Sequence, residues 1–233
     1  MDYTDPNTYL EGRVLFIDKP LTWTSFDVVN KIRKSLRHHL GIGKIKVGHA
    51  GTLDPLATGL VIICTGKATK QIMQYQNLDK LYEAQVRLGA TTPSFDLETE
   101  VDKSFPWEHI TSTDIGEAIN AFKGDLEQMP PLYSAKRVDG KRAYDMARKG
   151  KTLELKPQYV TIHRLEILKE NLPDLSLLVE CSKGTYIRSL ARDIGEKLNS
   201  GAHLTGLRRT RIGPYEVEQA ISIDNFIKKL ELL

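Results

Sequence analysis

A stretch of small residues around a single Asp-Pro pair constrains this chain more than any other feature. It runs from Gly48 to Gly59 and reads GHAGTLDPLATG. Its glycines and alanines let a ligand or another segment approach the backbone closely. Pro55 fixes its own φ and keeps Asp54 out of the helical region. The stretch therefore predicts a rigid loop holding one carboxylate between two strands. By these general rules alone, both an ordinary turn and a functional site are compatible with the stretch.

The hydrophobic pattern on both sides of this loop predicts an α+β fold. Strands are expected at 13–18, 44–48, 60–64, 81–89, 160–168, 175–181 and 207–212, and apolar and polar side chains alternate along 81–89. Helices are expected at 24–40, 68–75, 111–123, 140–149, 185–199 and from 222 onward. The first of these begins with Thr24 and Asp27 in a capping-box pattern. Because these elements mix without a steady βαβ rhythm, we expect a mixed, mostly antiparallel central sheet flanked by helices.

Length and composition indicate one domain in a cytoplasmic protein. The 233 residues suffice for a single large core, and we expect residues 1–233 to form one domain with a polar, acidic excursion around 90–128. No apolar run approaches the roughly 20 residues of a membrane span, and the polar N-terminus does not resemble a signal peptide. Cys64 and Cys181 are far apart and are predicted to be reduced strand residues. No metal or organic cofactor is expected, because neither ligand spacing nor a nucleotide-binding motif is present.

Positive charge is concentrated although the formal net charge is only +3. Residues 31–46 hold several lysines and arginines and no acid. Residues 136–151 form a second basic cluster, and residues 208–211 form a third. An acidic stretch, 94–128, separates the first two. One interpretation is that the basic clusters are solvated faces of the protein; the other is that they bind a polyanionic partner.

Several segments in order resemble TruB-type tRNA pseudouridine synthases, whose bacterial members modify the T-arm uridine numbered 55 in tRNA. The loop 48–59 resembles the catalytic motif of that family. Further blocks that resemble it are Lys19-Pro20 with Thr24-Ser25, Lys80-Leu81-Tyr82, Pro130 to Ala135, Gly184 to Leu190, and Ala202 to Arg209. The resemblance implies the pseudouridine synthase-like fold and an isomerase acting on tRNA.

The chain departs from the family pattern in two places. Lys136-Arg137 stands where the family often has an apolar residue and then a lysine, so basic character is kept. Many bacterial members also carry a C-terminal PUA-type RNA-binding domain. The chain ends too soon after the last block for such a domain, so we expect RNA affinity to rest on the catalytic domain alone.

The resemblance assigns catalytic roles to four residues. Asp54 would be the nucleophile, attacking either the sugar carbon or the uracil ring, and an unperturbed aspartate is ionised at neutral pH. Arg188 resembles the family arginine that pairs with this carboxylate. Tyr82 resembles the tyrosine that stacks on the flipped base and that has been proposed to handle the carbon-5 proton. Tyr186 resembles a second active-site tyrosine.

Other residues are expected to contact RNA. His49 resembles the histidine that holds the RNA loop open, Lys19 and Pro20 are expected to shape one wall of the pocket, and Leu207 to pack near the base. Backbone phosphates are expected to meet basic side chains. The candidates are Arg33, Arg37, Lys136, Arg137, Lys141, Arg142, Arg148, Arg208 and Arg209. The expected partner is the T-stem-loop of tRNA, bound by a monomer that requires no protein partner.

Three rival functions predict other features of the sequence. A non-catalytic protein that binds or folds tRNA on the same scaffold predicts loss of Asp54 or Arg188, and both are present. A Ser-His-Asp hydrolase predicts a Gly-x-Ser-x-Gly elbow, which the sequence lacks. A glycosidase-like carboxylate pair would take its second acid from Asp96 or Glu98, which lie in the polar stretch. None of these explains the ordered blocks, so the sequence predicts a tRNA pseudouridine synthase.

Overall fold

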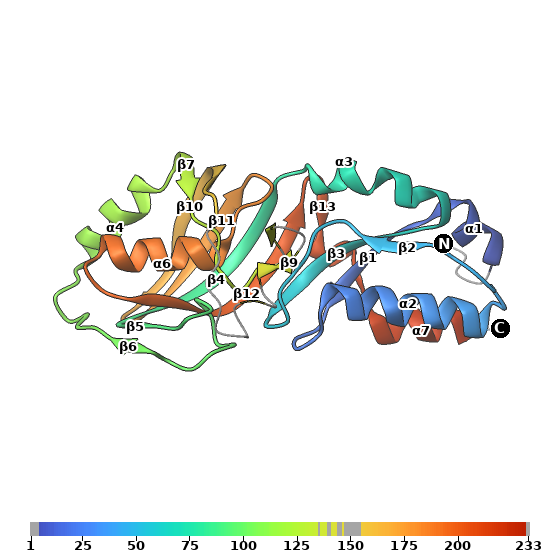
Figure 1. Ribbon diagram of the computed structural model, residues 1–233, viewed down its shortest axis with the longest axis horizontal. Helices are drawn as coiled ribbons and strands as arrows, with labels where there is room; N and C mark the ends of the chain where they lie inside the picture. Colours follow the sequence, from blue (N-terminus) through green and yellow to red (C-terminus); the bar gives the residue numbers. More distant parts are fainter. Residues whose placement is uncertain (1–4, 135, 139–140, 144–145, 147–154, 232–233) are drawn as a thin grey trace. The chain divides into compact units, whose positions relative to one another are not determined.

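The computed structural model describes residues 5–134, 136–138, 141–143, 146 and 155–231, and it divides into two compact units (Figure 1). Unit 1 comprises Met1–Leu81 and Arg208–Leu233, and unit 2 comprises Tyr82–Leu207. Strands β4 (Lys80–Leu88) and β12 (Ala202–Ile212) each have residues in both units. The predicted α+β class is confirmed, whereas the single catalytic domain stays a prediction.

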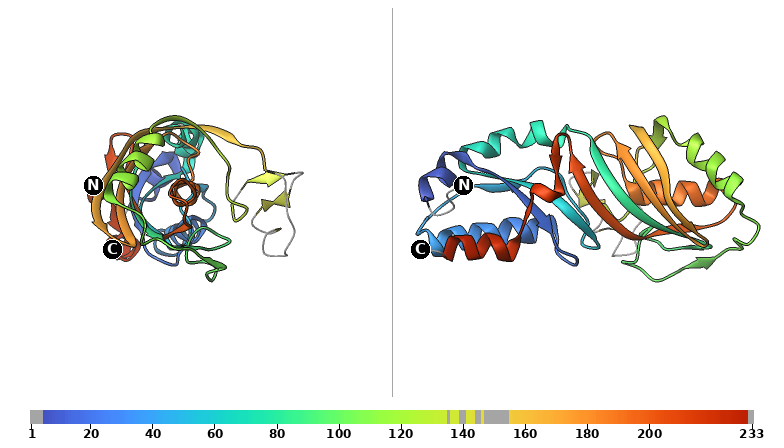
Figure 2. Two further views of the ribbon diagram at one scale, coloured as in Figure 1. Left: turned by 90° about the vertical axis from the view of Figure 1, so that its left-hand side faces the viewer. Right: turned by 180° about the vertical axis from the view of Figure 1, so that it is seen from behind.

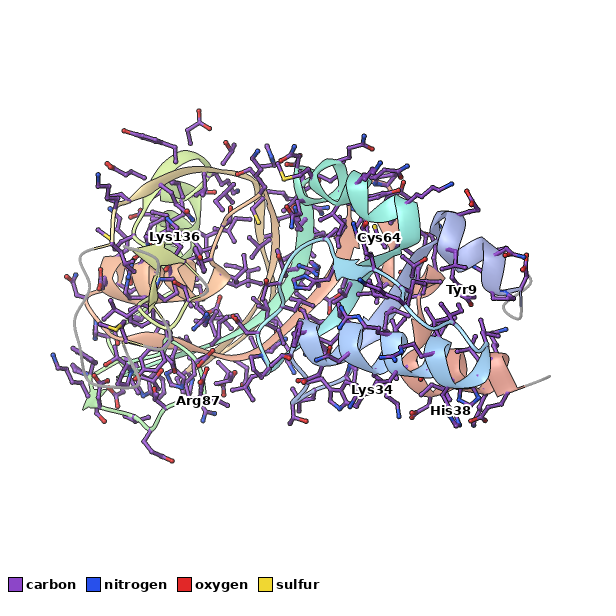
Figure 3. All side chains as sticks on the ribbon, turned by 45° about the vertical axis from the view of Figure 1, so that its right-hand side comes forward. Tyr9, Lys34, His38, Cys64, Arg87 and Lys136 are labelled. Carbon is purple, nitrogen blue, oxygen red and sulfur yellow. The ribbon has the colours of Figure 1, made fainter. Side chains whose placement is uncertain are left out.

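Unit 1 contains a mixed sheet in which β1 (Val14–Lys19) lies between β14 and β3. The other strands are β2 (Val47–His49), β3 (Ala57–Thr65), β13 (Tyr215–Glu216) and β14 (Ile221–Ser222). β1 pairs in parallel with β14 and antiparallel with β3, and β3 also pairs with β2. Cys64 of β3, labelled in Figure 3, is buried and free. Cys181 of β11 (Asp174–Cys181) in unit 2 is also buried and free, as the sequence indicated.

The helices of unit 1 are α1 (Pro6–Gly12), η1 (Gly66–Gln71), α3 (Ile72–Gln76), η2 (Val217–Gln219), α2 (Ser25–His39) and α7 (Ile223–Glu231). α2 and α7 lie side by side in Figure 1 and in the right-hand view of Figure 2, and they contact each other. α2 begins at the predicted capping box, in which Thr24 and Asp27 each bind the other's backbone. Its apolar side, with Val28, Ile32 and Leu36, is buried, which fixes the helix against the sheet.

Unit 2 contains strands in the order β4, β11, β10, β7. Its elements are β5 (Ala90–Thr91), β6 (Lys103–Ser104), α4 (Ser112–Ala121), β7 (Gly124–Gln128), β8 (Arg137–Val138), β9 (Lys141–Arg142), β10 (Gln158–Asn171), β11 (Asp174–Cys181) and α6 (Ile187–Lys197). β10 is antiparallel to both β11 and β7, and α4 contacts both α6 and β10. The side chains of β4 alternate between buried and exposed, as predicted.

Part of the acidic stretch lies in unit 2, where β7 pairs with β10 and α4 contacts α6. One expectation differs from the structure. The helix predicted at 140–149 is wrong at Lys141–Arg142, which form β9 opposite Arg137–Val138; most of its other residues lie outside the described part.

Within the described residues, no helix combines the length and the apolar character needed to cross a bilayer. The same part of the chain contains no cluster of histidine, cysteine and carboxylate side chains suited to a metal ion.

Candidate active site

The loop that carries Asp54 is a tight turn between β2 and β3 in unit 1. The Asp54 carbonyl oxygen accepts a hydrogen bond from the Ala57 amide at 3.1 Å. Pro55 occupies the second position of this turn, where its fixed φ is favoured. The Ala50 amide donates to the Ile62 carbonyl at 2.9 Å, which ties the start of the loop to β3. The carboxylate therefore stands, half-buried, on a short and restrained segment.

Ser25 anchors the loop to the first turn of α2. Its hydroxyl oxygen accepts from the Leu53 amide at 2.8 Å and donates to the Leu53 carbonyl at 3.3 Å. Both residues are buried. A single side chain thus satisfies both main-chain polar groups of the residue before Asp54, where neither group can reach water.

Lys19 anchors the other side of the turn. Its side chain is fully buried, and the ammonium donates to the carbonyls of Pro20 at 2.9 Å, Trp23 at 2.5 Å and Pro55 at 3.4 Å. Burial lowers the pKa of Lys19 to about 8, although the Asp54 carboxylate acts to raise it. The ammonium therefore holds the turn and adds positive charge close to the carboxylate.

Arg209 clamps the loop from β12. Its guanidinium donates to the carbonyl oxygens of Leu60 at 2.7 Å, Thr52 at 3.4 Å and Gly51 at 3.2 Å. The side chain is 1% exposed. Its donors therefore face the loop rather than solvent, and we treat Arg209 as a positioning residue, although the sequence suggested a phosphate contact.

Gly59 makes this close approach possible. It has φ +106°, and a Cβ there would lie 2.2 Å from the Arg209 carbonyl oxygen. Only glycine fits this backbone and this space. The small residues of the motif thus serve to pack β3 against β12.

Two further candidates in unit 1 have defined surroundings. Burial lowers the pKa of His49, which favours the neutral form of its ring. Arg208 forms a two-pronged ion pair with Asp18, with nitrogen–oxygen distances of 3.1 and 2.8 Å. Pro20 is exposed.

In unit 2, Arg188 is held at the start of α6. It is 3% exposed and donates to the carbonyls of Ser94 at 3.1 Å and Tyr133 at 2.8 Å. Its Nε lies 3.6 Å from a carboxylate oxygen of Asp96, which is also buried. Asp96, considered above as the second acid of a glycosidase-like pair, therefore orients and neutralises a buried guanidinium.

Two tyrosines complete the candidate residues of unit 2. Tyr186 caps α6, and the buried Gln128 fixes its backbone. The Tyr186 amide donates to the Gln128 side-chain oxygen at 2.8 Å, and the Gln128 side-chain amide donates to the Tyr186 carbonyl at 3.1 Å. Tyr82 points to the buried side of β4 and is 7% exposed. Leu207 is half-buried in β12.

The structure brings together only part of the predicted set within each unit. In unit 1, Lys19 and Arg209 hold the loop that carries Asp54. Lys136 is half-buried in unit 2 (Figure 3). The side chains of Arg137, Lys141 and Arg142, and the whole of Arg148, lie outside the described residues.

Sequence reasoning missed three supporting residues: Ser25 as a loop anchor, Asp96 as a partner of Arg188, and Gln128 as a partner of Tyr186. Their partners lie 28 to 92 positions away along the chain, so no local pattern marked them. Only the Thr24-Ser25 block gave a signal near Ser25.

Comparison with known proteins covers nearly the whole chain. Residues 37–187 match the model of the TruB family pseudouridylate synthase N-terminal domain, and residues 188–232 match that of the tRNA pseudouridylate synthase B C-terminal domain. The tRNA pseudouridine synthase B of Phocaeicola vulgatus is 60% identical over 223 residues, which cover 96% of this chain and 95% of the relative. That of Flavobacterium johnsoniae is 53% identical over 227 residues, covering 97% and 99%.

Solved structures show the same fold. A Cbf5–Nop10–Gar1 complex matches with a TM-score of 0.71 at 26% identity, covering 97% of this chain and 61% of that one. An H/ACA RNP bound to a substrate RNA containing 2′-deoxyuridine matches with a TM-score of 0.68 at 25% identity, covering 97% and 57%. This chain therefore spans less than two thirds of those longer proteins.

Proposed function

Because the chain belongs to the TruB family of tRNA pseudouridine synthases and thus isomerises uridine to pseudouridine in tRNA, we propose that Asp54 is its catalytic carboxylate and that its target is the T-arm uridine numbered 55. The observation that carries the assignment is the anchoring of the Asp54 loop. Ser25, Lys19 and Arg209 hold this loop from three different elements. Precise placement of a nucleophile lowers its activation barrier.

The reaction needs a group that can bond to the nucleotide and leave again. The bond between the ribose and nitrogen 1 of uracil breaks, the ring turns, and a bond to carbon 5 forms while the carbon-5 proton moves to nitrogen 1. Asp54 performs the attack, at the sugar carbon or at the ring, and is expelled unchanged. No atom is gained or lost, which agrees with a site built from ordinary side chains.

The remaining proposed catalytic groups are Tyr82, Tyr186 and Arg188. Tyr82 stacks on the flipped uracil, a contact worth roughly 1–3 kcal/mol per base. Tyr186 and Arg188 complete the set by resemblance to the family. The buried contacts of Arg188 with Ser94 and Asp96 support a positioning of its guanidinium before RNA binds.

We assign RNA contacts near the target nucleotide to His49, Pro20 and Leu207. The buried Lys19 instead shapes the wall of the pocket, because its ammonium holds the turn at Pro55. Phosphate contacts are assigned to Lys136, Arg137, Lys141, Arg142, Arg148 and Arg208. We further propose that the enzyme works as a monomer in the cytoplasm, without a protein partner or cofactor. The non-catalytic alternative is not favoured, because the relatives that match nearly the whole chain are named as synthases.

The direct test maps pseudouridine by chemical labelling after incubation with an unmodified tRNA transcript. Wild type, Asp54→Asn and the control Asp224→Asn are compared, since Asp224 is an exposed carboxylate on α7. We expect modification at the T-arm uridine with wild type and with the control, and none with Asp54→Asn.

Two results contradict the proposal. Pseudouridine formation by Asp54→Asn removes Asp54 from the catalytic role. Binding of the transcript by wild type with every uridine unchanged makes RNA folding the leading function.

A further inference from the structure

The solvent-facing side of α2 carries a row of cations. Lys31, Lys34 and Arg37 are exposed and recur at every third position, so they share one face of the helix. Beyond the helix, Lys44 and Lys46 are also exposed. We call these five residues the basic stripe. Figure 3 shows Lys34 on the outer side of α2.

The charges of the basic stripe are not used inside the protein. Within the described part of the chain, none of the five side chains forms an ion pair or hydrogen bond, and no acid interrupts the sequence from 31 to 46. Like charges on one helix face repel each other and destabilise the helix slightly. A bound polyanion would relieve this repulsion.

Arg33 behaves differently and shows how the stripe continues past the helix. Its guanidinium donates to the Asn30 side chain at 2.9 Å and to the Val47 carbonyl at 3.0 Å. The bond to Val47 ties the start of β2 to α2. Lys46 precedes Val47 and therefore lies beside the helix. The exposed cations therefore extend from α2 onto the segment that leads into the catalytic motif.

The stripe also begins near the reactive loop. Ser25, the first residue of α2, binds Leu53 next to Asp54. Phe26 follows it and is 60% exposed. From there the 15-residue helix runs for about 22 Å at 1.5 Å per residue. An exposed aromatic ring followed by unpaired cations is the combination used by surfaces that track a nucleic-acid strand.

We propose that the basic stripe binds the phosphate backbone of tRNA outside the reacting nucleotide. The inference rests on the proposed function, because it assumes the same RNA substrate. Its contribution is affinity that does not depend on base sequence and weakens with salt. The stripe adds to the contacts assigned above and takes no part in the chemistry.

The test removes four charges of the stripe together, with Lys34→Gln, Arg37→Gln, Lys44→Gln and Lys46→Gln. The matched control removes four exposed lysines of unit 2, with Lys103→Gln, Lys123→Gln, Lys169→Gln and Lys197→Gln. Equilibrium binding of an unmodified tRNA transcript is measured over a range of salt concentrations with both sets in an Asp54→Asn background. kcat and KM are measured with the same sets in the wild-type background.

We expect the stripe variant to bind tRNA at least about tenfold more weakly at roughly 0.1 M salt, with a slope of log Kd against log salt that is smaller by about 3. KM rises and kcat is unchanged. The control variant binds like the parent. Lys34→Arg, Lys44→Arg and Lys46→Arg together retain the charges and are expected to restore binding, which separates loss of charge from loss of fold.

Failure of the stripe and failure of the proposed function give different results. If wild type makes no pseudouridine, the proposed function fails, whatever the binding curves show. If pseudouridine forms but the stripe variant binds tRNA with the affinity and salt slope of the control, the stripe proposal is overturned. It is equally overturned if the variant loses binding to phosphatidylserine vesicles while tRNA binding is unchanged.

Discussion

Replacing Ser25 by alanine removes the hydroxyl that ties the aspartate loop to α2. The Leu53 amide loses a 2.8 Å hydrogen bond and its carbonyl loses a weaker one at 3.3 Å, in a place where both residues are buried. An unsatisfied buried donor costs roughly 1–3 kcal/mol, and alanine returns about 0.5 kcal/mol through its higher helix propensity. We therefore expect the free energy of unfolding to fall by about 2 kcal/mol.

The same change is expected to slow the reaction. Leu53 precedes Asp54, so a released Leu53 backbone lets the carboxylate move. A misplacement of about 1 Å can reduce the rate on the order of 100-fold. We expect kcat to fall about 10- to 100-fold, with little change in KM, because the buried Ser25 hydroxyl is not exposed to RNA.

Urea unfolding followed by circular dichroism gives the stability change, and single-turnover pseudouridine formation gives the rate. Ser35→Ala is the matched control, since Ser35 is a buried serine of the same helix that does not bind the loop. If Ser25→Ala loses stability but keeps the rate of wild type, the inference that this bond positions Asp54 is refuted. If both variants behave alike, the stability estimate also fails.

Two further predictions concern the packing around the loop. Gly59→Ala places a Cβ 2.2 Å from a main-chain oxygen of β12 at φ +106°. We expect the free energy of unfolding, measured by thermal melts, to fall by more than about 3 kcal/mol. The control is Gly116→Ala in α4, whose Cβ meets no atom within 4 Å and which is expected to be neutral or slightly stabilising. Similar melts for the two variants would show that the loop tolerates a Cβ. Burial holds the folded pKa of Lys19 near 8 against 10.5 for an exposed lysine, so between these values the unfolded state binds more protons and stability rises with pH. Relative to Lys19→Met, the free energy of unfolding of wild type is expected to rise by about 1.5 kcal/mol between pH 8 and 9.5 in denaturant titrations. If the free energies of unfolding of the two proteins change with pH in parallel, this effect of burial on Lys19 is excluded.

The features that sequence predicted well depend on residues close together in the chain. The Thr24–Asp27 capping box and the alternation along β4 each involve neighbours within a few positions, and both are confirmed. The short helix α1 was missed although Asp5 and Pro6 form an ordinary helix start. It is only seven residues long, too short for a clear apolar period.

The features that sequence did not predict depend on long-range packing. Arg209 reads as a surface cation in a basic cluster, yet its guanidinium lies among loop carbonyls from 51 to 60. Gln128 reads as an unremarkable polar residue before a Met-Pro-Pro break, yet it fixes the backbone of Tyr186. Charge and polarity in the sequence do not reveal whether a long side chain points outward or toward main-chain oxygens.

The two buried cations of unit 1 also determine what the loop offers to a nucleotide. The carbonyl oxygens of Gly51, Thr52 and Leu60 accept from Arg209, and that of Pro55 accepts from Lys19 and from the Thr22 amide. Main-chain acceptors that are already occupied compete weakly for the N–H and O–H groups of an incoming ribose or base. The Asp54 carboxylate therefore stands in a segment with few rival acceptors. We therefore expect a substrate to be selected there by how well it fits one carboxylate rather than by a general affinity for exposed backbone.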